Sequence, residues 1–376
     1  MGGLIMKYPI RVLQVVTYMG RGGLETMLMN YYRHIDRSKV QFDFLVHRDF
    51  EADYDKEILE LGGRIYHIDR LIPWSKDYKN KLIKFFNDHD EYKIVHVHQD
   101  CLSSVALECA KKCNVPVRIA HSHNSNQDKN LKYPIKLFYR KRIPNVATDL
   151  FACSQSSGEW MFGEHNFRVL KNAINTESYI YNSVTASKIK IELGLEDSFV
   201  IGHVGLFRPQ KNHPFIIDIF NECKNLDSSS KLILIGDGEG RKDIEELVKS
   251  KGLENDVIFM GIQENVNELL QAMDVFLFPS LYEGLSVALL EAEAAGLPCF
   301  ISDSISDECI VTKGLIEKIS LNTSPKIWAQ KIVDKKIFQR IDTRNELKMA
   351  GYDIVESSKQ LENYYLNSYK NTVGEE

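Results

Sequence analysis

The sequence predicts an α/β protein in which parallel sheets are flanked by helices. Short apolar runs rich in β-branched residues alternate with longer helical stretches along the whole chain, and this alternation is typical of βαβ units around a parallel sheet. At about 150 residues per domain, the 376 residues correspond to about two and a half domain lengths, so we expect two domains. The apolar runs are also too numerous for one ordinary open sheet, so we expect two sheets of about five or six strands each.

The predicted strands fall into two series, one in each half of the chain. In the first half they are Ile10–Val16, Phe42–Val46, Ile65–Ile68, Lys93–His98, Val117–His121 and Leu150–Ser154. In the second half they are Phe199–Val204, Lys231–Ile235, Val257–Met260, Val275–Phe278 and Pro298–Ser302. A polar stretch follows the seam at Asn172–Asn175, so we predict domains over 1–178 and 179–352. We expect a C-terminal helix over about 353–376 to pack back on the first domain.

Composition and charge exclude several classes of protein. The chain is 44% apolar and 26% charged, which is ordinary for a globular protein. Its net charge of −5 excludes a nucleic-acid-binding polycation, and it has no apolar run near the ~20 residues that span a bilayer. Its first ten residues lack the apolar core of a secretory signal. Seven cysteines without a Cys-x-x-Cys pair argue against a disulfide framework or a zinc ribbon. We therefore expect a reduced, cytoplasmic protein.

The first candidate site is the glycine-rich loop after strand Ile10–Val16. Ligands of open parallel sheets bind at the carboxyl ends of the strands, and here Gly22 and Gly23 open a predicted helix. Glycines let the backbone approach a ligand, and a helix start offers N–H groups to an anion. Glu25 stands where a dinucleotide-binding fingerprint needs glycine, and its charge would face a pyrophosphate. A tight turn without a ligand is the alternative.

Two cations follow the first strand of the second half. Arg208 and Lys211 are three residues apart beyond Phe199–Val204, so both could reach one anionic group. A diphosphate is the obvious candidate, since it needs fixed positive charge where no metal neutralises it. Solvated surface charges are the alternative.

Two glutamates flank the start of a helix after strand Val275–Phe278. Glu283 lies on the loop, and the helix is predicted over Ser286–Ala295 because Gly296 and Pro298 follow it. Glu291 lies more than a turn inside this helix, with its side chain leaning toward the helix start. A glutamate among apolar neighbours is rarely buried without a partner. Sugar hydroxyls would satisfy both carboxylates, whereas a solvent-facing Glu291 is the alternative.

Two His-x-His pairs end strands of the first half. They are His96 with His98, and His121 with His123. Alternate residues of a strand share a face, so a metal site is conceivable. No Asp, Glu or Cys stands at metal-ligand spacing beside them, so we predict no metal. A structural histidine, hydrogen-bonded at a strand end, is the alternative for each.

A basic stretch follows the second pair. Its cations recur at spacings of three and four and are Lys129, Lys132, Lys136 and Arg140. If the stretch is helical, they form a basic face with apolar and aromatic neighbours, as in helices that bind anionic membrane surfaces. Solvated charge is the alternative.

Together these motifs resemble the family-four retaining glycosyltransferases, which have the GT-B architecture of two facing Rossmann-like domains. The resemblance covers essentially the whole chain. The motifs that carry it are Glu283-x7-Glu291, Arg208-Pro-x-Lys211-Asn212, the Gly22-Gly23 loop, the seam Asn172–Asn175 and Gly236-Asp237-Gly238. At the seam, Ala173 replaces the family's usual Gly and Asn175 its usual Asp.

The resemblance implies a nucleotide-sugar donor, UDP being the expected nucleotide, held by the second domain and an acceptor held mostly by the first. It implies transfer without a metal or cofactor, to a lipid-linked or saccharide acceptor in surface polysaccharide synthesis. Arg208 and Lys211 would neutralise the diphosphate, Glu283 would bind the donor sugar and Glu291 the ribose. The cradle for phosphate and sugar would consist of the amides of Gly284, Leu285, Ser286 and Val287. A histidine of the first domain would lie beside the transferred sugar; the alignment favours His121, and a slip would favour His123.

Three other functions fit parts of the pattern. A nucleotide-sugar epimerase or hydrolase could share the two-domain plan, and only the fate of the sugar separates it from a transferase. Glu25 argues against an NAD-dependent oxidoreductase. The intact pair of Glu283 and Glu291 argues against a non-catalytic nucleotide-sugar-binding module.

Overall fold

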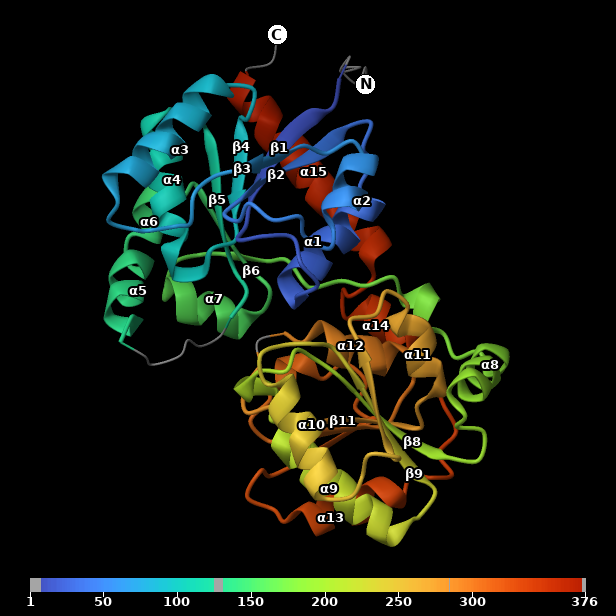
Figure 1. Cartoon of the computed structure of the whole chain (residues 1–376). Coiled ribbons are helices and arrows are strands. Elements are labelled where there is room, and N and C mark those ends of the chain that lie inside the picture. The colour runs from blue at the N-terminus through green and yellow to red at the C-terminus, as the bar shows by residue number, and fades with distance from the viewer. Residues whose placement is uncertain (1–7, 125–130, 284, 374–376) are drawn as a thin grey trace. The chain divides into compact units, whose positions relative to one another are not determined.

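A computed structural model describes residues 8–124, 131–283 and 285–373 of the chain. The chain divides into two compact units, which are Met1–Ala173 with Ile354–Glu376 (unit 1) and Ile174–Asp353 (unit 2). Each unit is built on one parallel sheet with helices packed against it (Figure 1). The predicted α/β class with two parallel sheets is therefore confirmed.

Within the described residues, the sheet of unit 1 has seven strands in the order β3-β2-β1-β4-β5-β6-β7. They are β1 (Ile10–Val15), β2 (Val40–Val46), β3 (Ile65–His67), β4 (Ile94–Val97), β5 (Val117–Ser122), β6 (Asp149–Ala152) and β7 (Arg168–Val169). The first six are the strands that the sequence predicts. β7 was missed because two exposed residues do not form a recognisable apolar run.

Both faces of this sheet are covered. The helices of unit 1 are α1 (Gly23–His34), α2 (Asp55–Glu60), α3 (Lys76–Asp88), η1 (Asp100–Leu102), α4 (Ser103–Lys112), α5 (Tyr133–Arg140), α6 (Ile143–Val146), α7 (Gln155–Phe162) and α15 (Ile354–Val373). Val12 of β1 belongs to the apolar core that contains α1 and α15 residues, whereas Leu13 belongs to the core that contains α3 and α4 residues. This alternation is what a sheet buried on two sides requires.

Helix α15 follows unit 2 in the chain and yet packs in unit 1 beside α1 (Figure 1). Tyr365 is fully buried there, with its ring 5.9 Å from that of Phe42. The division differs slightly from the predicted 1–178 and 179–352, since residues 174–178 lie in unit 2. Ile174 forms a parallel bridge with Asp353, and the Thr176 hydroxyl donates to the Asp353 carboxylate at 3.2 Å.

The described part of unit 2 has a six-stranded sheet in the order β10-β9-β8-β11-β12-β13. The strands are β8 (Phe199–Val204), β9 (Ser230–Ile235), β10 (Val257–Gly261), β11 (Val275–Phe278), β12 (Cys299–Ser302) and β13 (Ile316–Ile319). β13 was not predicted, because Glu317 and Lys318 interrupt its apolar pattern at the edge of the sheet.

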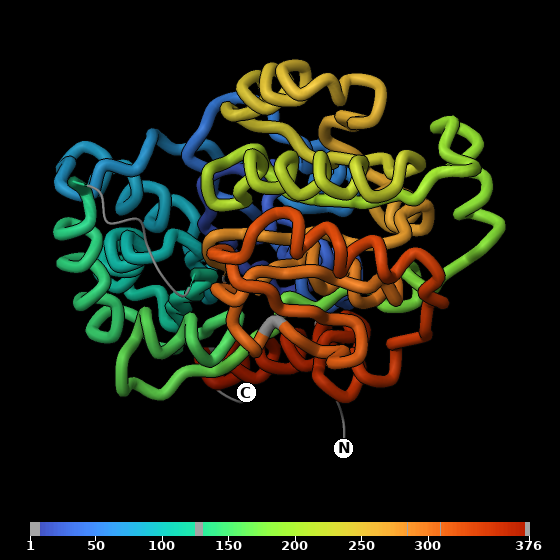
Figure 2. Tube along the Cα trace, turned by 90° about the horizontal axis from the view of Figure 1, so that it is seen from below, coloured from blue at the N-terminus to red at the C-terminus, as the bar shows by residue number. Residues whose placement is uncertain are grey.

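The helices of unit 2 include two that lie side by side, α9 and α13 (Figures 1 and 2). Among the described residues of unit 2, the helices are η2 (Thr176–Tyr179), α8 (Ser183–Leu193), η3 (Pro209–Lys211), α9 (His213–Leu226), α10 (Arg241–Ser250), α11 (Val266–Ala272), α12 (Val287–Ala294), η4 (Asp307–Cys309), α13 (Pro325–Val333) and α14 (Arg344–Met349). Trp328 of α13 is fully buried with its ring 5.8 Å from Phe215 of α9. None of the helices within the described ranges is both long and apolar enough to cross a bilayer.

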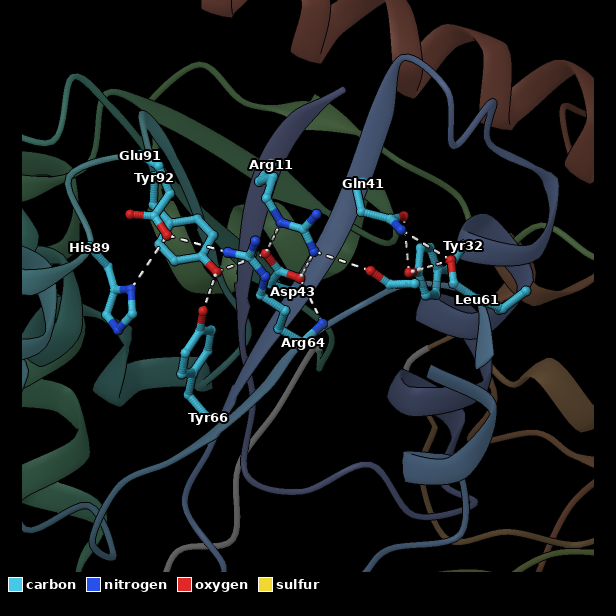
Figure 3. Close-up of polar contacts among 11 residues, drawn as sticks. Arg11, Tyr32, Gln41, Asp43, Leu61, Arg64, Tyr66, His89, Glu91 and Tyr92 are labelled. Carbon is cyan, nitrogen blue, oxygen red and sulfur yellow. Dashed lines mark hydrogen bonds and ion pairs between the residues drawn. The ribbon is translucent and has the colours of Figure 1, made fainter. Parts of the chain in front are cut away.

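An ion pair between Arg11, which is partly exposed, and Asp43, which is buried, joins β1 to β2 (Figure 3). The Arg11 guanidinium donates to both carboxylate oxygens of Asp43 at 2.5 Å. The backbone N–H of Arg64 and the hydroxyl of Tyr92 also donate to this carboxylate, each at 2.7 Å. Asp43 is fully buried, so these four bonds replace its hydration.

We expect Asp43→Asn to lower the free energy of unfolding of unit 1 by about 3–5 kcal/mol, because it leaves the Arg11 charge without its buried partner. Urea unfolding measures the change. The matched control is Glu91→Gln, which removes the ion pair of Glu91 with Arg64 at 3.4 Å, where both side chains are exposed. That control should cost about 1 kcal/mol or less. Equal losses in the two variants would contradict the burial argument.

Candidate functional site

The strand order of each sheet reverses at one point, and three of the predicted site loops follow strands that flank these points. In unit 1 the reversal lies between β1 and β4, and in unit 2 between β8 and β11. Open parallel sheets bind ligands beyond the carboxyl ends of the strands at such a point. The glycine loop follows β1, and the Arg208 and Glu283 loops follow β8 and β11.

In unit 2, the loop after β8 is bonded to the loop after β11. The backbone N–H of Leu281 donates to the carbonyl of Gln210 at 2.8 Å, and the Gln210 side-chain amide donates to the carbonyl of Tyr282 at 2.9 Å. The Asn212 amide donates to the carbonyl of Pro279 at 3.2 Å. The two motifs that carry Arg208 and Glu283 therefore form one structural element.

This element contains an ion pair that the sequence did not predict. Lys211 Nζ lies 2.7 Å from Glu283 Oε1, and the Glu283 side chain is 7% exposed. The Lys211 ammonium also lies 4.6 Å from the centroid of the Phe278 ring. A Cβ at Gly205 would come within 3.2 Å of the Lys211 side chain, so the glycine leaves room for this lysine. Arg208 is exposed and has no carboxylate partner among the described residues, which leaves its charge available to an anion.

The backbone after β9 contacts the loop after β8. Gly236 and Gly238 have φ values of +133° and +154°, which L-residues with a side chain rarely adopt. A Cβ at Gly236 would lie 2.1 Å from the carbonyl oxygen of Gly205, so the backbones after β8 and β9 are in direct contact.

Glu291 lies inside α12 and is buried, as its apolar neighbours predict. The hydroxyl of Tyr179 donates to Glu291 Oε1 at 2.7 Å. Burial raises the pKa of Glu291 to about 7, and the hydrogen bond from Tyr179 opposes this rise. Sequence analysis missed Tyr179, because it lies in a polar stretch without a motif.

The start of α12 agrees closely with the predicted helix. The Ser286 hydroxyl accepts from the N–H of Leu289 at 3.4 Å, which makes Ser286 the N-cap. Leu285, Ser286 and Val287 are all buried. Gly284, the remaining member of the predicted amide cradle, lies outside the described residues.

In unit 1, the two His-x-His pairs meet in one group, which we call the imidazole cluster (His96, His98, His121 and His123). His96 Nε2 lies 3.1 Å from His121 Nδ1, and His98 Nδ1 lies 2.9 Å from His123 Nε2. Desolvation lowers the pKa of every imidazole in the cluster, that of His123 to about 3, so the rings are neutral near pH 7.

His96 and His98 also contact residues outside the cluster. His96 Nδ1 lies 2.7 Å from the hydroxyl of Tyr365 in α15, and His98 Nε2 lies 2.9 Å from Gln14 Oε1 in β1. Nitrogen atoms of His96, His98 and His121 lie within 4.8 Å of one another, which is compatible with a metal ion. The contacts above engage these rings with one another and with Tyr365 and Gln14, so the prediction of no metal remains our expectation.

The glycine loop of unit 1 is covered by its own carboxylate. Gly22 is the N-cap of α1, and a Cβ there would lie 2.3 Å from Glu25 Oε2, whereas a Cβ at Gly23 would meet no atom within 4 Å. Glu25 therefore lies over the helix start where a pyrophosphate would bind, which disfavours a dinucleotide site.

The predicted basic face forms part of α5, although Lys129 lies outside the described residues. Lys132 is exposed, and the apolar side chains of Leu131 and Phe138 are 99% and 57% exposed beside it. Arg140 donates to the carbonyl of Trp160 at 2.8 Å and lies over the Trp160 ring.

Two protein-family models match the chain. The model described as Glycosyltransferase Family 4 matches residues 21–178, and the model described as Glycosyl transferases group 1 matches residues 186–325. Together they cover most of both units.

Curated relatives and solved structures agree with these models. The putative glycosyltransferase EpsF of Bacillus subtilis is 36% identical over 94% of this chain and 96% of its own. The UDP-Gal:alpha-D-GlcNAc-diphosphoundecaprenol alpha-1,3-galactosyltransferase of Escherichia coli is 25% identical over 80% of this chain and 82% of its own. The structure of Anabaena Alr3699/HepE in complex with UDP-glucose has a TM-score of 0.77 at 19% identity, covering 95% of this chain and 99% of that one.

The pKa of Glu291 predicts how stability depends on pH. With a pKa of about 7 against an ordinary 4.5, folded unit 2 retains a proton in this window that the unfolded chain releases. Stability therefore falls as pH rises through the window, by about 3 kcal/mol at about 1.4 kcal/mol per pKa unit. Glu291→Gln lacks this titration, so urea unfolding should show its advantage over wild type growing from about pH 4.5 to pH 8.

Tyr179→Phe gives the companion measurement. It removes the hydrogen bond that lowers the pKa of Glu291, so the same loss of stability should extend to higher pH. If the difference between Glu291→Gln and wild type does not vary with pH, then the burial of an ionisable carboxyl is not the cause.

Proposed function

The chain belongs to the glycosyltransferases of the family-four type, and we propose that it moves a sugar from a UDP-sugar to a lipid-linked or saccharide acceptor with retention at the anomeric carbon. The observation that carries this proposal is the joined element of unit 2, where Arg208, Lys211, Glu283 and α12 meet beside the reversal of strand order. The printed name of the Escherichia coli relative, with its UDP-sugar and its diphosphoundecaprenol-linked acceptor, supports the choice of substrates.

Negative charge develops on the diphosphate as the sugar departs. Arg208, whose guanidinium is exposed, and Lys211 would stabilise this charge together with the N–H groups at the start of α12. These fixed charges take the part that a metal ion takes in other transferases, so we propose neither metal nor cofactor. Departure of the diphosphate on the face that the acceptor attacks would give retention without a carboxylate nucleophile.

The two glutamates would hold different parts of the donor. Glu283 would bind hydroxyls of the sugar and Glu291 those of the ribose, while His121 or His123 of unit 1 would lie beside the transferred sugar. We place the reaction in surface polysaccharide synthesis on the cytoplasmic side of the membrane. An epimerase or hydrolase would use the same donor site, and mass spectrometry of the products tells whether the sugar reaches an acceptor.

The glutamates can be separated by calorimetric titration with UDP. Losing a hydrogen bond to a charged group costs about 1.5–3 kcal/mol, or about ten- to hundredfold in affinity. Glu291→Ala should therefore weaken UDP by that factor. Glu283→Ala releases Lys211 from its ion pair, so it should not weaken UDP, but it should reduce affinity for the UDP-sugar. Equal UDP affinity in all three proteins would remove this assignment.

The predicted basic face, with Lys132 and Lys136 among its cations, should bind vesicles that contain anionic lipid. Each lysine near such a surface contributes about 1 kcal/mol, so the double variant Lys132→Ala/Lys136→Ala should bind about thirtyfold more weakly in a sedimentation assay. Arg140 is left intact because of its contacts with Trp160. The control is Lys188→Ala, an exposed lysine of α8. Binding that ignores both salt and these substitutions would exclude an electrostatic membrane surface.

A further inference from the structure

The imidazole cluster consists of two hydrogen-bonded pairs, His98 with His123 and His96 with His121. Hydrogen bonds connect both pairs to the side chain of Gln14. Gln14 Oε1 contacts His98, and Gln14 Nε2 donates to the hydroxyl of Tyr365 at 3.4 Å, which in turn contacts His96. At the other end of the pairs, His121 Nε2 and His123 Nδ1 are shielded from solvent and have no hydrogen-bond partner in the described part of the chain. We call these two atoms the outer nitrogens.

The pair that starts at His98 has a fixed direction. A neutral imidazole carries one N–H and one bare nitrogen. Because Gln14 Oε1 can only accept, His98 Nε2 carries the hydrogen and His98 Nδ1 is bare. His123 Nε2 must then donate to His98 Nδ1, so the outer nitrogen of His123 is bare and can only accept.

In the pair of His96 and His121, which is connected to Tyr365, the hydrogen bonds are donated in the opposite direction. The Tyr365 oxygen accepts from Gln14, so its own proton goes to His96 Nδ1, since an unpaired buried hydroxyl would cost about 1–3 kcal/mol. His96 Nε2 therefore carries the hydrogen and donates to His121 Nδ1. The outer nitrogen of His121 is then an N–H donor.

This opposition does not depend on which way the amide of Gln14 points. If its oxygen and nitrogen exchange places, every donor in both pairs becomes an acceptor, and the outer nitrogens exchange roles. An amide has one accepting and one donating end. One histidine pair is therefore always connected to the acceptor of Gln14 and the other to its donor. The outer nitrogens are one donor and one acceptor in either case.

We propose that Gln14 is a positioning residue whose single amide fixes the tautomers of the imidazole cluster, so that one outer nitrogen donates and the other accepts. A hydroxyl group can pair with either outer nitrogen because it both accepts and donates, whereas a phosphate or carboxylate oxygen only accepts and an ammonium only donates. The hydroxyl is that of a bound water or of the donor sugar. The assignment to a sugar rests on the proposed function, but the fixing of the tautomers does not.

Nitrogen NMR of the full-length protein with labelled histidine tests the tautomers directly, because protonated and bare ring nitrogens have well-separated shifts. In wild type without ligand at about pH 8, one outer nitrogen should carry a hydrogen and the other should be bare. Gln14→Glu presents accepting oxygens to both pairs, so both outer nitrogens should become bare. The same one-donor, one-acceptor pattern in Gln14→Glu would overturn the proposal.

Tyr365→Phe keeps the test informative if the glutamate variant does not fold. It breaks the link to His96 alone, so the tautomer of His121 should become mixed while that of His123 stays as in wild type. The matched control is Tyr364→Phe, on the same helix, whose hydroxyl is not part of either pair and should leave all four rings unchanged. Stoichiometric binding of Zn²⁺ to the cluster would also overturn the proposal, because a metal would require bare nitrogens directed toward it.

The sugar is tested separately from the tautomers. Adding UDP-glucose should shift the signals of the outer nitrogens, whereas UDP alone should not. If UDP binds by calorimetry and neither addition shifts these signals, the partner is water and the sugar assignment is wrong, although the tautomers remain fixed by Gln14. If UDP does not bind at all, the proposed function fails while the tautomer result still stands or falls by itself.

Discussion

The reversal of strand order beside β1 and β8 is the constraint on which both candidate sites depend. Helical connections leave opposite sides of the sheet at this point, so no connection covers the carboxyl ends of the central strands. Polar residues lie at these strand ends and just beyond them. In unit 2 these are Arg208, Lys211 and Glu283, and in unit 1 they are the imidazole cluster.

Patterns within the chain predicted the elements and the helix start, because they depend on local chemistry. The six earlier strands of unit 1, all five predicted strands of unit 2 and the approximate bounds of α12 follow from apolar runs, Gly and Pro. The partners within the sites could not be predicted in this way. Tyr179 meets Glu291 and Lys211 meets Glu283 across 112 and 72 residues, and no spacing rule reaches so far. The two His-x-His pairs were noticed, but their meeting depends on β4 and β5 being neighbours.

Both carboxylates of the candidate site in unit 2 have partners within the protein. Glu283 is paired with a lysine and Glu291 with a tyrosine hydroxyl, so neither carboxylate waits as an isolated buried group. In the proposed function, binding a nucleotide sugar would be an exchange of partners, in which hydroxyls of the ligand replace protein groups. Such an exchange would contribute less to affinity than a new hydrogen bond, because the protein groups lose the bonds that they already make.

The return of α15 to unit 1 has a consequence for the order of events during synthesis. A ribosome makes α1 and the seven-stranded sheet first, then all of unit 2, and releases α15 afterwards. Until then the apolar surface that α15 covers stays open to water and to chaperones, while unit 2 has its whole sequence available and can fold. Synthesis of unit 1 therefore begins first and ends last. A chain truncated before Tyr365 would contain all of unit 2 but only an incomplete unit 1.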